Sequence, residues 1–131
     1  MKELNDFLNS IYLGDRYCER LEVDDKKIVI QINLLSRIKQ GCNEWNYYSD
    51  KDIEHGCLVF EDVVEYHQNS ELPLNDEIYE IQVIGKEGDI YSFIVCGCNV
   101  SDKAVSTDIK YQIKARKFYI FDPQNKKKII K

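Results

Sequence analysis

Residues 78–100 have the sequence IYEIQVIGKEGDIYSFIVCGCNV, and this stretch decides the fold class. Apolar and polar residues alternate over 78–84, which is the period of a half-buried strand. The polar segment 85–89 follows, and a mostly apolar partner segment occupies 90–100. We expect an antiparallel hairpin here, because a short turn can join two antiparallel strands but not two parallel ones.

Segments with the same strand period lie on both sides of this hairpin. They are residues 20–24, 28–34, 58–66, 109–115 and 118–121. Val29 and Leu35 add apolar side chains to the second face of the strand at 28–34, so we expect both faces of that strand to be covered. Pro123 ends the series, because proline cannot donate a hydrogen bond to a strand ladder.

One helix is predicted, at residues 2–12. Leu4, Phe7, Leu8 and Ile11 recur at the spacing of one helical face, and polar residues occupy the other face. A helix of this kind stabilises itself by burying its apolar face against the rest of the protein.

Together these segments predict a mainly β (α+β) protein: an antiparallel β-sandwich or half-open barrel of six to seven strands, with the N-terminal helix over an edge or one end. We expect a single domain over residues 1–131. Its parts are the helix at 2–12, a β-rich body at 16–122 and a basic C-terminal tail at 123–131. Residues 37–56 show neither period, which predicts a long irregular excursion of the kind that often carries function.

The composition is that of an ordinary globular protein. The chain has 131 residues, of which 44% are hydrophobic and 31% charged, enough to bury a core without disulfides or metals. No stretch approaches the roughly 20 apolar residues that span a bilayer, and the N-terminus lacks the pattern of a signal peptide. Five cysteines without a framework spacing indicate reduced thiols. We therefore expect a soluble, cytoplasmic protein that does not bind membranes.

Four residues could in principle ligate zinc: His55, Cys57, Cys96 and Cys98. Their spacing matches no familiar zinc motif, and two cysteines two positions apart on one strand give poor tetrahedral geometry. Cysteine on an apolar strand face more often acts as a small hydrophobe. We expect no metal site, although the sequence does not show whether these four side chains converge.

No catalytic or cofactor motif accounts for the sequence. His55 and His67 are the only histidines, and neither lies in a familiar nucleophile context. The segment 85–88 joins two strands and does not open a helix, so a hairpin turn is a better interpretation than a phosphate loop. We expect no catalytic residue, no cofactor and no enzymatic activity.

Charge is unevenly distributed along the chain. Residues 50–80 contain ten acidic residues and one lysine, a local charge of −9 in a chain whose net charge is −5. An acidic surface repels nucleic acid and attracts basic proteins. We therefore expect a protein partner and no nucleic acid.

Aromatic residues next to this acidic block are of the types that anchor protein interfaces. The candidate partner-binding residues are Trp45, Tyr47, Tyr48, Asp50, Asp52, Glu54, Glu61, Asp62 and Tyr66. The alternative is that the acidic residues are merely solvated and the aromatic residues belong to the core.

Three stretches carry a family resemblance: residues 11–18 (IYLGDRYC), residues 31–32 with 36–38, and residues 45–54 continuing to 58–60. They resemble a family of small bacterial proteins related to the immunity proteins of polymorphic-toxin and contact-dependent growth inhibition systems. The resemblance covers about the first half of the chain. It implies a cytosolic protein that binds one cognate toxin domain, blocks its active site and has no catalytic residues of its own.

An acidic surface would suit a basic nuclease toxin, because the carboxylates compete with phosphate for the same cationic groups. We expect a monomer or weak dimer. Two alternatives remain open: a small β-barrel that binds a ligand or hydrolyses an unknown substrate, and a structural or scaffold subunit.

Overall fold

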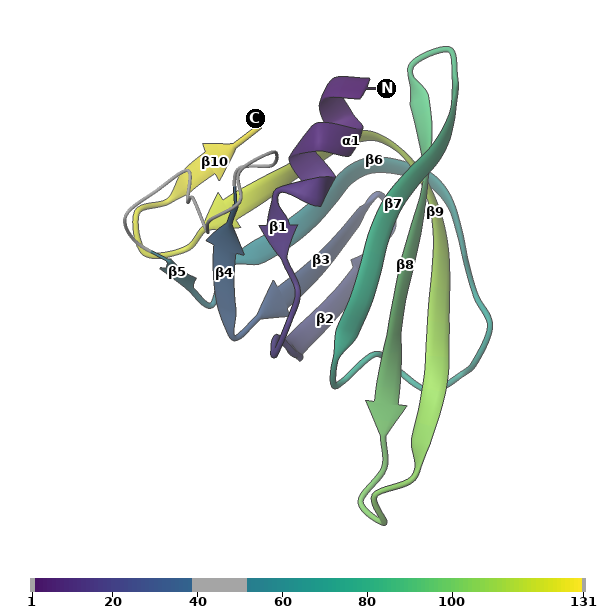
Figure 1. Cartoon of the computed structure of the whole chain (residues 1–131). Coiled ribbons are helices and arrows are strands. Elements are labelled where there is room, and N and C mark those ends of the chain that lie inside the picture. The colour runs from purple at the N-terminus through teal and green to yellow at the C-terminus, as the bar shows by residue number, and fades with distance from the viewer. Residues whose placement is uncertain (1, 39–51, 131) are drawn as a thin grey trace.

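The computed structural model describes residues 2–38 and 52–130, and its architecture is mainly β, as predicted (Figure 1). The described elements in chain order are α1 (Lys2–Asn9), β1 (Ile11–Tyr12), β2 (Cys18–Asp24), β3 (Lys27–Ile32), β4 (Leu34–Arg37), β5 (Ile53–Glu54), β6 (Cys57–Gln68), β7 (Ile78–Glu87), β8 (Ile90–Val100), β9 (Ser106–Asp122) and β10 (Lys127–Ile129). No helix among them has the length and hydropathy needed to cross a membrane.

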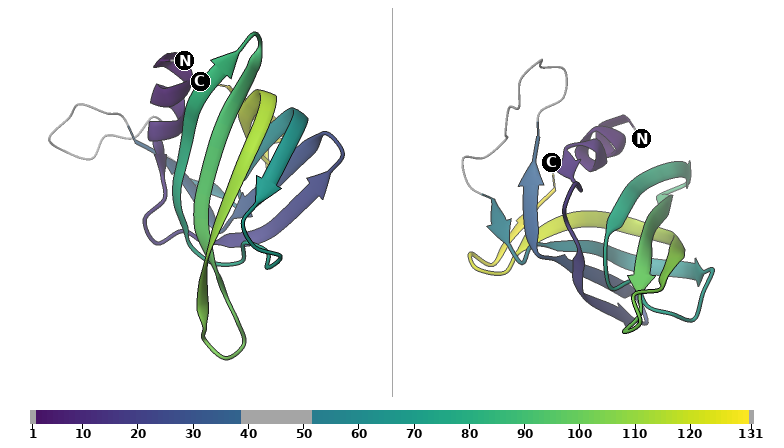
Figure 2. Two further views of the ribbon diagram at one scale, coloured as in Figure 1. Left: turned by 90° about the vertical axis from the view of Figure 1, so that its right-hand side faces the viewer. Right: turned by 60° about the horizontal axis from the view of Figure 1, so that its bottom comes forward.

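A seven-stranded antiparallel sheet forms the body of the protein. Its order is β2-β3-β6-β9-β8-β7, and β10 pairs with the end of β9 that β8 leaves free. The sheet is strongly curved, so that its two edge strands approach each other at one end (Figure 2). There the Cys18 N–H donates to the Asp76 carbonyl at 2.8 Å, and Tyr17 forms a single bridge with Glu77. The sheet does not close into a barrel, which matches the open alternative of the predicted fold.

The two central strands change faces part-way along their length. On β6, Phe60 and Val63 both belong to the core although their spacing is odd, and on β9 the same is true of Ala115 and Phe118. Asp62 lies between the first pair and has a φ of 55°. Irregularities of this kind bend a strand and increase its twist, which accounts for the curvature at the centre of the sheet.

The main core lies on the concave side of the sheet, beneath α1 (Figure 2). Phe7 of α1 meets the ring of Phe118 edge-on at 5.7 Å, and Phe60 contacts both Phe93 and Phe118 at 5.1 Å. Such pairs contribute about 0.5–1.5 kcal/mol each beyond the burial of their area. The predicted amphipathic helix therefore covers the sheet with its apolar face.

Gly97 of β8 marks a close approach between strands. A Cβ atom added there would lie 2.4 Å from the Glu77 carbonyl oxygen and 2.5 Å from the Leu74 side chain. Leu74 itself is 2% exposed and closes this end of the core. Only glycine fits at this position without displacing backbone.

A second, three-stranded sheet has the order β1-β4-β5. It extends the β3–β6 pair past a kink, where the His55 N–H donates to the Asn33 carbonyl at 3.1 Å. Beyond the kink, Leu34 of β4 lies opposite Glu54 of β5. The predicted irregular excursion at 37–56 is thus partly wrong, since its described ends belong to strands β4 and β5.

The end of the helix, the strand in the C-terminal tail and the number of strands differ from the sequence prediction. The helix ends at Asn9 and not at residue 12, because Ile11 leaves it to pair with Arg37 and the Ser10 hydroxyl bonds to the last helical turn. Within the basic C-terminal tail at 123–131, Lys127–Ile129 forms β10 after a turn held by the Asp122 carboxylate. The described residues form ten strands and not six or seven, because the short strands of the small sheet and β10 were not predicted.

Candidate functional site

The face of the large sheet opposite the core carries a second apolar cluster. Cys57, Val59 and Tyr119 are only 3%, 3% and 5% exposed, and Val29 and Phe121 pack against them. These residues alternate along their strands with residues of the main core. The outer face of an antiparallel sheet is usually polar, so this cluster calls for a separate explanation.

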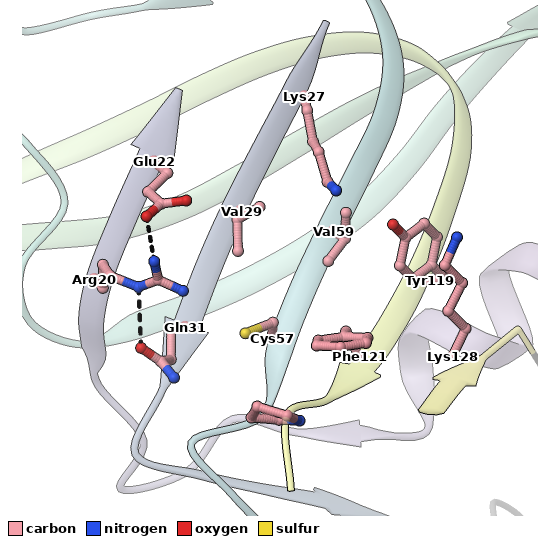
Figure 3. A pocket seen from close by; sticks show the side chains of 11 residues that line it. Arg20, Glu22, Lys27, Val29, Gln31, Cys57, Val59, Tyr119, Phe121 and Lys128 are labelled. Carbon is pink, nitrogen blue, oxygen red and sulfur yellow. Dashed lines mark hydrogen bonds and ion pairs between the residues drawn. The ribbon is translucent and has the colours of Figure 1, made fainter. Parts of the chain in front are cut away.

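The cluster forms the floor of an open groove with a volume of about 290 Å³ (Figure 3). The groove crosses β2, β3, β6, β9 and β10, all of which send side chains into it. Its lining residues are Arg20, Glu22, Lys27, Val29, Gln31, Cys57, Val59, Tyr119, Phe121, Pro123 and Lys128. An apolar floor is therefore surrounded by a rim of charged side chains.

The rim is mainly cationic. Arg20 forms an ion pair with Glu22 and also donates from Nε to the Gln31 side chain at 3.1 Å. On the other side of the floor, the Lys128 ammonium lies 4.7 Å from the centre of the Tyr119 ring. With Lys27, three cations and one carboxylate line the groove, giving it a local charge of +2 in a chain of net charge −5.

Tyr119 is fixed at the edge of the groove by Glu61. Its hydroxyl donates to Oε2 of Glu61 at 2.7 Å, and the Lys117 ammonium lies 3.9 Å from the other carboxylate oxygen. Burial and then the bond to Glu61 raise the pKa of Tyr119 to about 12. The same bond, which outweighs desolvation, lowers the pKa of Glu61. The pair therefore stays a neutral phenol and an ionised carboxylate across the physiological pH range.

The predicted partner-binding residues that the structure describes do not share one surface. Asp52 and Glu54 are exposed beside the small sheet, where Asp52 accepts a hydrogen bond from the Ser36 hydroxyl at 2.7 Å. Tyr66, which is 43% exposed, lies opposite Ile113 and so points to the concave side of the sheet. The predicted residues Trp45, Tyr47, Tyr48 and Asp50 lie outside the described residues.

The remaining two predicted acids lie on β6, and one of them, Glu61, borders the groove. Glu61 bonds to Tyr119, and Asp62 lies 3.6 Å from the Lys117 ammonium. Farther along β6, Glu65 forms an ion pair with Lys114 at 3.6 Å. The lysines of β9 thus offset part of the negative charge that the sequence concentrates in residues 50–80.

The three stretches that carry the family resemblance converge on the small sheet. Arg16, from the first stretch, donates to the Ser36 hydroxyl of the second at 3.1 Å. Ser36 in turn donates to Asp52 of the third, and the Arg16 guanidinium lies over the Tyr12 ring at 5.0 Å. These residues hold β1, β4 and the approach to β5 together, which is a structural role.

The four potential zinc ligands do not converge. Cys57 lies opposite Phe121 and Cys96 opposite Lys110, at the two ends of β9. His55 instead bonds to Glu19 through Nδ1 at 2.6 Å. Over residues 2–38 and 52–130, no group of three or more His, Cys, Asp or Glu side chains is placed to hold a metal ion.

Sequence reasoning missed the groove, although one signal pointed to it. The apolar second face of the strand at 28–34 was recognised through Val29, which indeed lies in the outer cluster. Leu35, the other residue of that signal, belongs to the main core because the chain kinks at Asn33. The contributions of Tyr119 and Lys128 depend on the face change of β9 and on β10, which the sequence pattern did not reveal.

Comparison with known families gives one match that covers the whole chain. A model described as a family of unknown function, DUF6258, matches residues 1–131. The searches of curated proteins and of solved structures found no match. The groove is therefore interpreted through its own chemistry.

Proposed function

The chain belongs to DUF6258, a family without an assigned function, and we propose that it binds a partner protein through the groove and neutralises it, as the resemblance to immunity proteins of toxin systems implies. The observation that carries this proposal is the apolar cluster of Cys57, Val59 and Tyr119 on the outer face of the sheet.

The groove has the composition of a protein interface. Interfaces have an apolar, often aromatic centre and a polar rim, and a few central residues supply most of the binding energy. Here Tyr119 and Phe121 supply aromatic floor residues, while Arg20, Lys27 and Lys128 form the rim. Cys57, Val59 and Tyr119 are already buried, so a partner seated on this floor would cover Val29 and Phe121, the partly exposed members of the cluster.

The floor is also held in place before any partner binds. Its residues lie on β3, β6 and β9, which are paired with one another along the ladder. A surface built on paired strands loses little conformational entropy on binding, so more of the contact energy appears as affinity. Neutralisation by occlusion requires only tight binding, because the bound partner's own working surface is covered.

The acidic block at residues 50–80 predicts that the partner is a basic nuclease. The exposure of Asp52 and Glu54 supports this prediction. The ion pairs of Glu61 and Asp62 with Lys117, in contrast, reduce the negative charge that could attract such a partner. Reversal of Asp52, Glu54 and Glu61 to lysine should weaken a complex with such a toxin and reduce its salt dependence. An unchanged affinity and salt dependence would exclude this class of partner.

A small-molecule binding protein is the second candidate function, and the groove itself favours it. Its volume of about 290 Å³ lies at the lower limit for ligand pockets, which span roughly 300–1,000 Å³. A screen of fragments by NMR would discriminate, because a true ligand site should shift the signals of Val59 and Phe121 at micromolar concentrations of one compound.

The direct test is co-purification of the tagged protein with the product of the adjacent upstream gene, together with growth rescue when the C-terminal domain of that product is expressed. We expect a 1:1 complex and rescue. Phe121→Ala should weaken the complex at least about tenfold, whereas Ile84→Ala, at an exposed site on β7, should not. Absence of both binding and rescue would overturn the proposal.

A further inference from the structure

We infer that the groove receives an extended acidic segment of the partner protein, which places one large apolar side chain on the floor between Val59 and Phe121. This inference rests on the proposed function and specifies the chemistry of the partner. It is carried by the charge, the width and the volume of the groove.

The rim holds two lysines whose charge the protein neutralises only in part. Arg20 is paired with Glu22, but within residues 2–38 and 52–130 neither Lys27 nor Lys128 forms an ion pair. Asp24 and Glu61 lie opposite Lys27 in the two neighbouring ladders, and Glu61, which is held by Tyr119 and Lys117, also interacts electrostatically with Lys27 and Lys128. Both lysines are exposed, and they complement a negatively charged occupant.

The width of the groove fits an extended peptide. It crosses five neighbouring strands, β2, β3, β6, β9 and β10, and adjacent strands are about 4.8 Å apart. The span is thus about 19 Å, which an extended segment of about six residues covers at roughly 3.3 Å per residue. Lys27 and Lys128 lie on strands on either side of β6 and β9, so such a segment would pass both.

The volume of the groove suits one anchoring side chain. At about 290 Å³ it lies at the lower limit for ligand pockets, and most of its floor is aliphatic or aromatic. Anchors of protein interfaces are typically single large side chains seated in a desolvated pocket. In such a segment, one aromatic or large aliphatic residue would contact the apolar floor, and flanking Asp or Glu residues would contact the cationic rim.

A peptide selection tests the inference with the full-length protein. Random heptapeptides displayed on phage would be selected against the wild type, and the enriched peptides synthesised and measured by fluorescence anisotropy. We expect enrichment of Asp and Glu around one aromatic or large aliphatic residue. Binding should weaken at least about tenfold in the double variant Lys27→Glu/Lys128→Glu and should also weaken with added salt.

The matched control is Lys103→Glu/Lys110→Glu, which changes the net charge equally at exposed positions away from the groove. It should bind the selected peptides like the wild type. No enrichment, enrichment of basic peptides, or equal loss in both double variants would overturn the inference. Tighter binding of a single-stranded oligonucleotide than of the acidic peptides would also overturn it, because Lys27 and Lys128 would then bind phosphate groups.

The same variants separate this inference from the proposed function. If the partner is captured equally well by wild type and by Lys27→Glu/Lys128→Glu, the protein still binds a partner but not through an acidic segment in the groove. If acidic peptides bind at the groove but no partner is captured and growth is not rescued, the proposed neutralising function fails.

Discussion

Removing one hydroxyl at the edge of the groove should produce a measurable and pH-dependent loss of stability. In Tyr119→Phe the ring stays in the outer cluster, while the bond from its hydroxyl to Glu61, 2.7 Å long, is lost. The Glu61 side chain is 26% exposed, and Lys117 remains beside it at 3.9 Å. The carboxylate therefore keeps one partner and some access to water after the change.

The size of the effect follows from these contacts. A hydrogen bond to a charged group contributes about 1.5–3 kcal/mol, and the remaining solvation of Glu61 points to the lower end. We expect the free energy of unfolding to fall by about 1.5 kcal/mol at pH 7. For a chain of this size, that corresponds to a urea midpoint lower by roughly 0.5–1 M.

The stability that the Tyr119–Glu61 bond adds should be lost both at low pH and at high pH. The folded-state pKa of Glu61 is lowered, chiefly by Tyr119, so its contribution is present above the ordinary value of 4.5 and is lost as pH falls through the lowered pKa. The pKa of Tyr119 is raised from 10.0 to about 12, so its contribution is present below pH 10 and is lost as pH rises toward 12. The difference between wild type and Tyr119→Phe should be largest between about pH 5 and pH 10.

The assay is urea denaturation followed by far-UV circular dichroism across this pH range. Tyr91→Phe is the matched control, because within the described residues no hydrogen bond of the Tyr91 hydroxyl is found and its ring contact with Lys86 is retained. Equal midpoints for the two variants at pH 7, or a difference that does not shrink at acidic pH, would refute the reasoning.

Three further predictions concern positions away from the groove edge. Gly97→Ala should lower the free energy of unfolding by about 2–3 kcal/mol in urea titrations, whereas Gly85→Ala, with nothing within 4 Å of the added Cβ, should change it by less than about 0.5 kcal/mol. The hydrogen bond to Glu19 raises the pKa of His55, so the stability that this bond adds is present below pH 6.5 and is lost as pH rises through the folded-state pKa. Glu19→Gln should therefore lower the midpoint of the His55 titration measured by NMR, and an unchanged midpoint would contradict this assignment. Burial raises the pKa of Cys18 to about 11, so mass spectrometry should find it unmodified by iodoacetamide at pH 8 until urea unfolds the chain. Rapid labelling of the native protein would contradict the burial of this thiol.

The strands of the large sheet could be predicted because their residues face two different environments. Ile28 and Ile30 are 1% and 0% exposed, and Ile109 and Ile113 are each 1% exposed. Buried apolar residues therefore recur at every second position of the sequence, which is the pattern that predicts a strand. The small sheet could not be predicted in the same way. Its strands β1 and β5 have two residues each, too few to show any period.

The candidate site was harder to predict, because it depends on which strands become neighbours. The acidic block at 50–80 is a property of the sequence, but the lysines that offset it, Lys114 and Lys117, come from β9. The groove likewise needs Val59 and Tyr119 on the same face, and these residues meet only through the pairing of β6 with β9. A pattern within one segment carries no information about such a partner.

The pairing of β6 with β9 at the centre of the sheet also determines how the chain must fold. Glu61 and Tyr119, on these two strands, are 58 positions apart, whereas the outer hairpins of the sheet join residues that are close in sequence. The entropy of closing this long loop must be lost before the central contacts form. We therefore expect the sequence-local pairs β2–β3, β7–β8 and β8–β9 to form early and the pairing of β6 with β9 to form late. The floor of the groove, which needs Val59 of β6 beside Tyr119 of β9, would then form only with this late pairing.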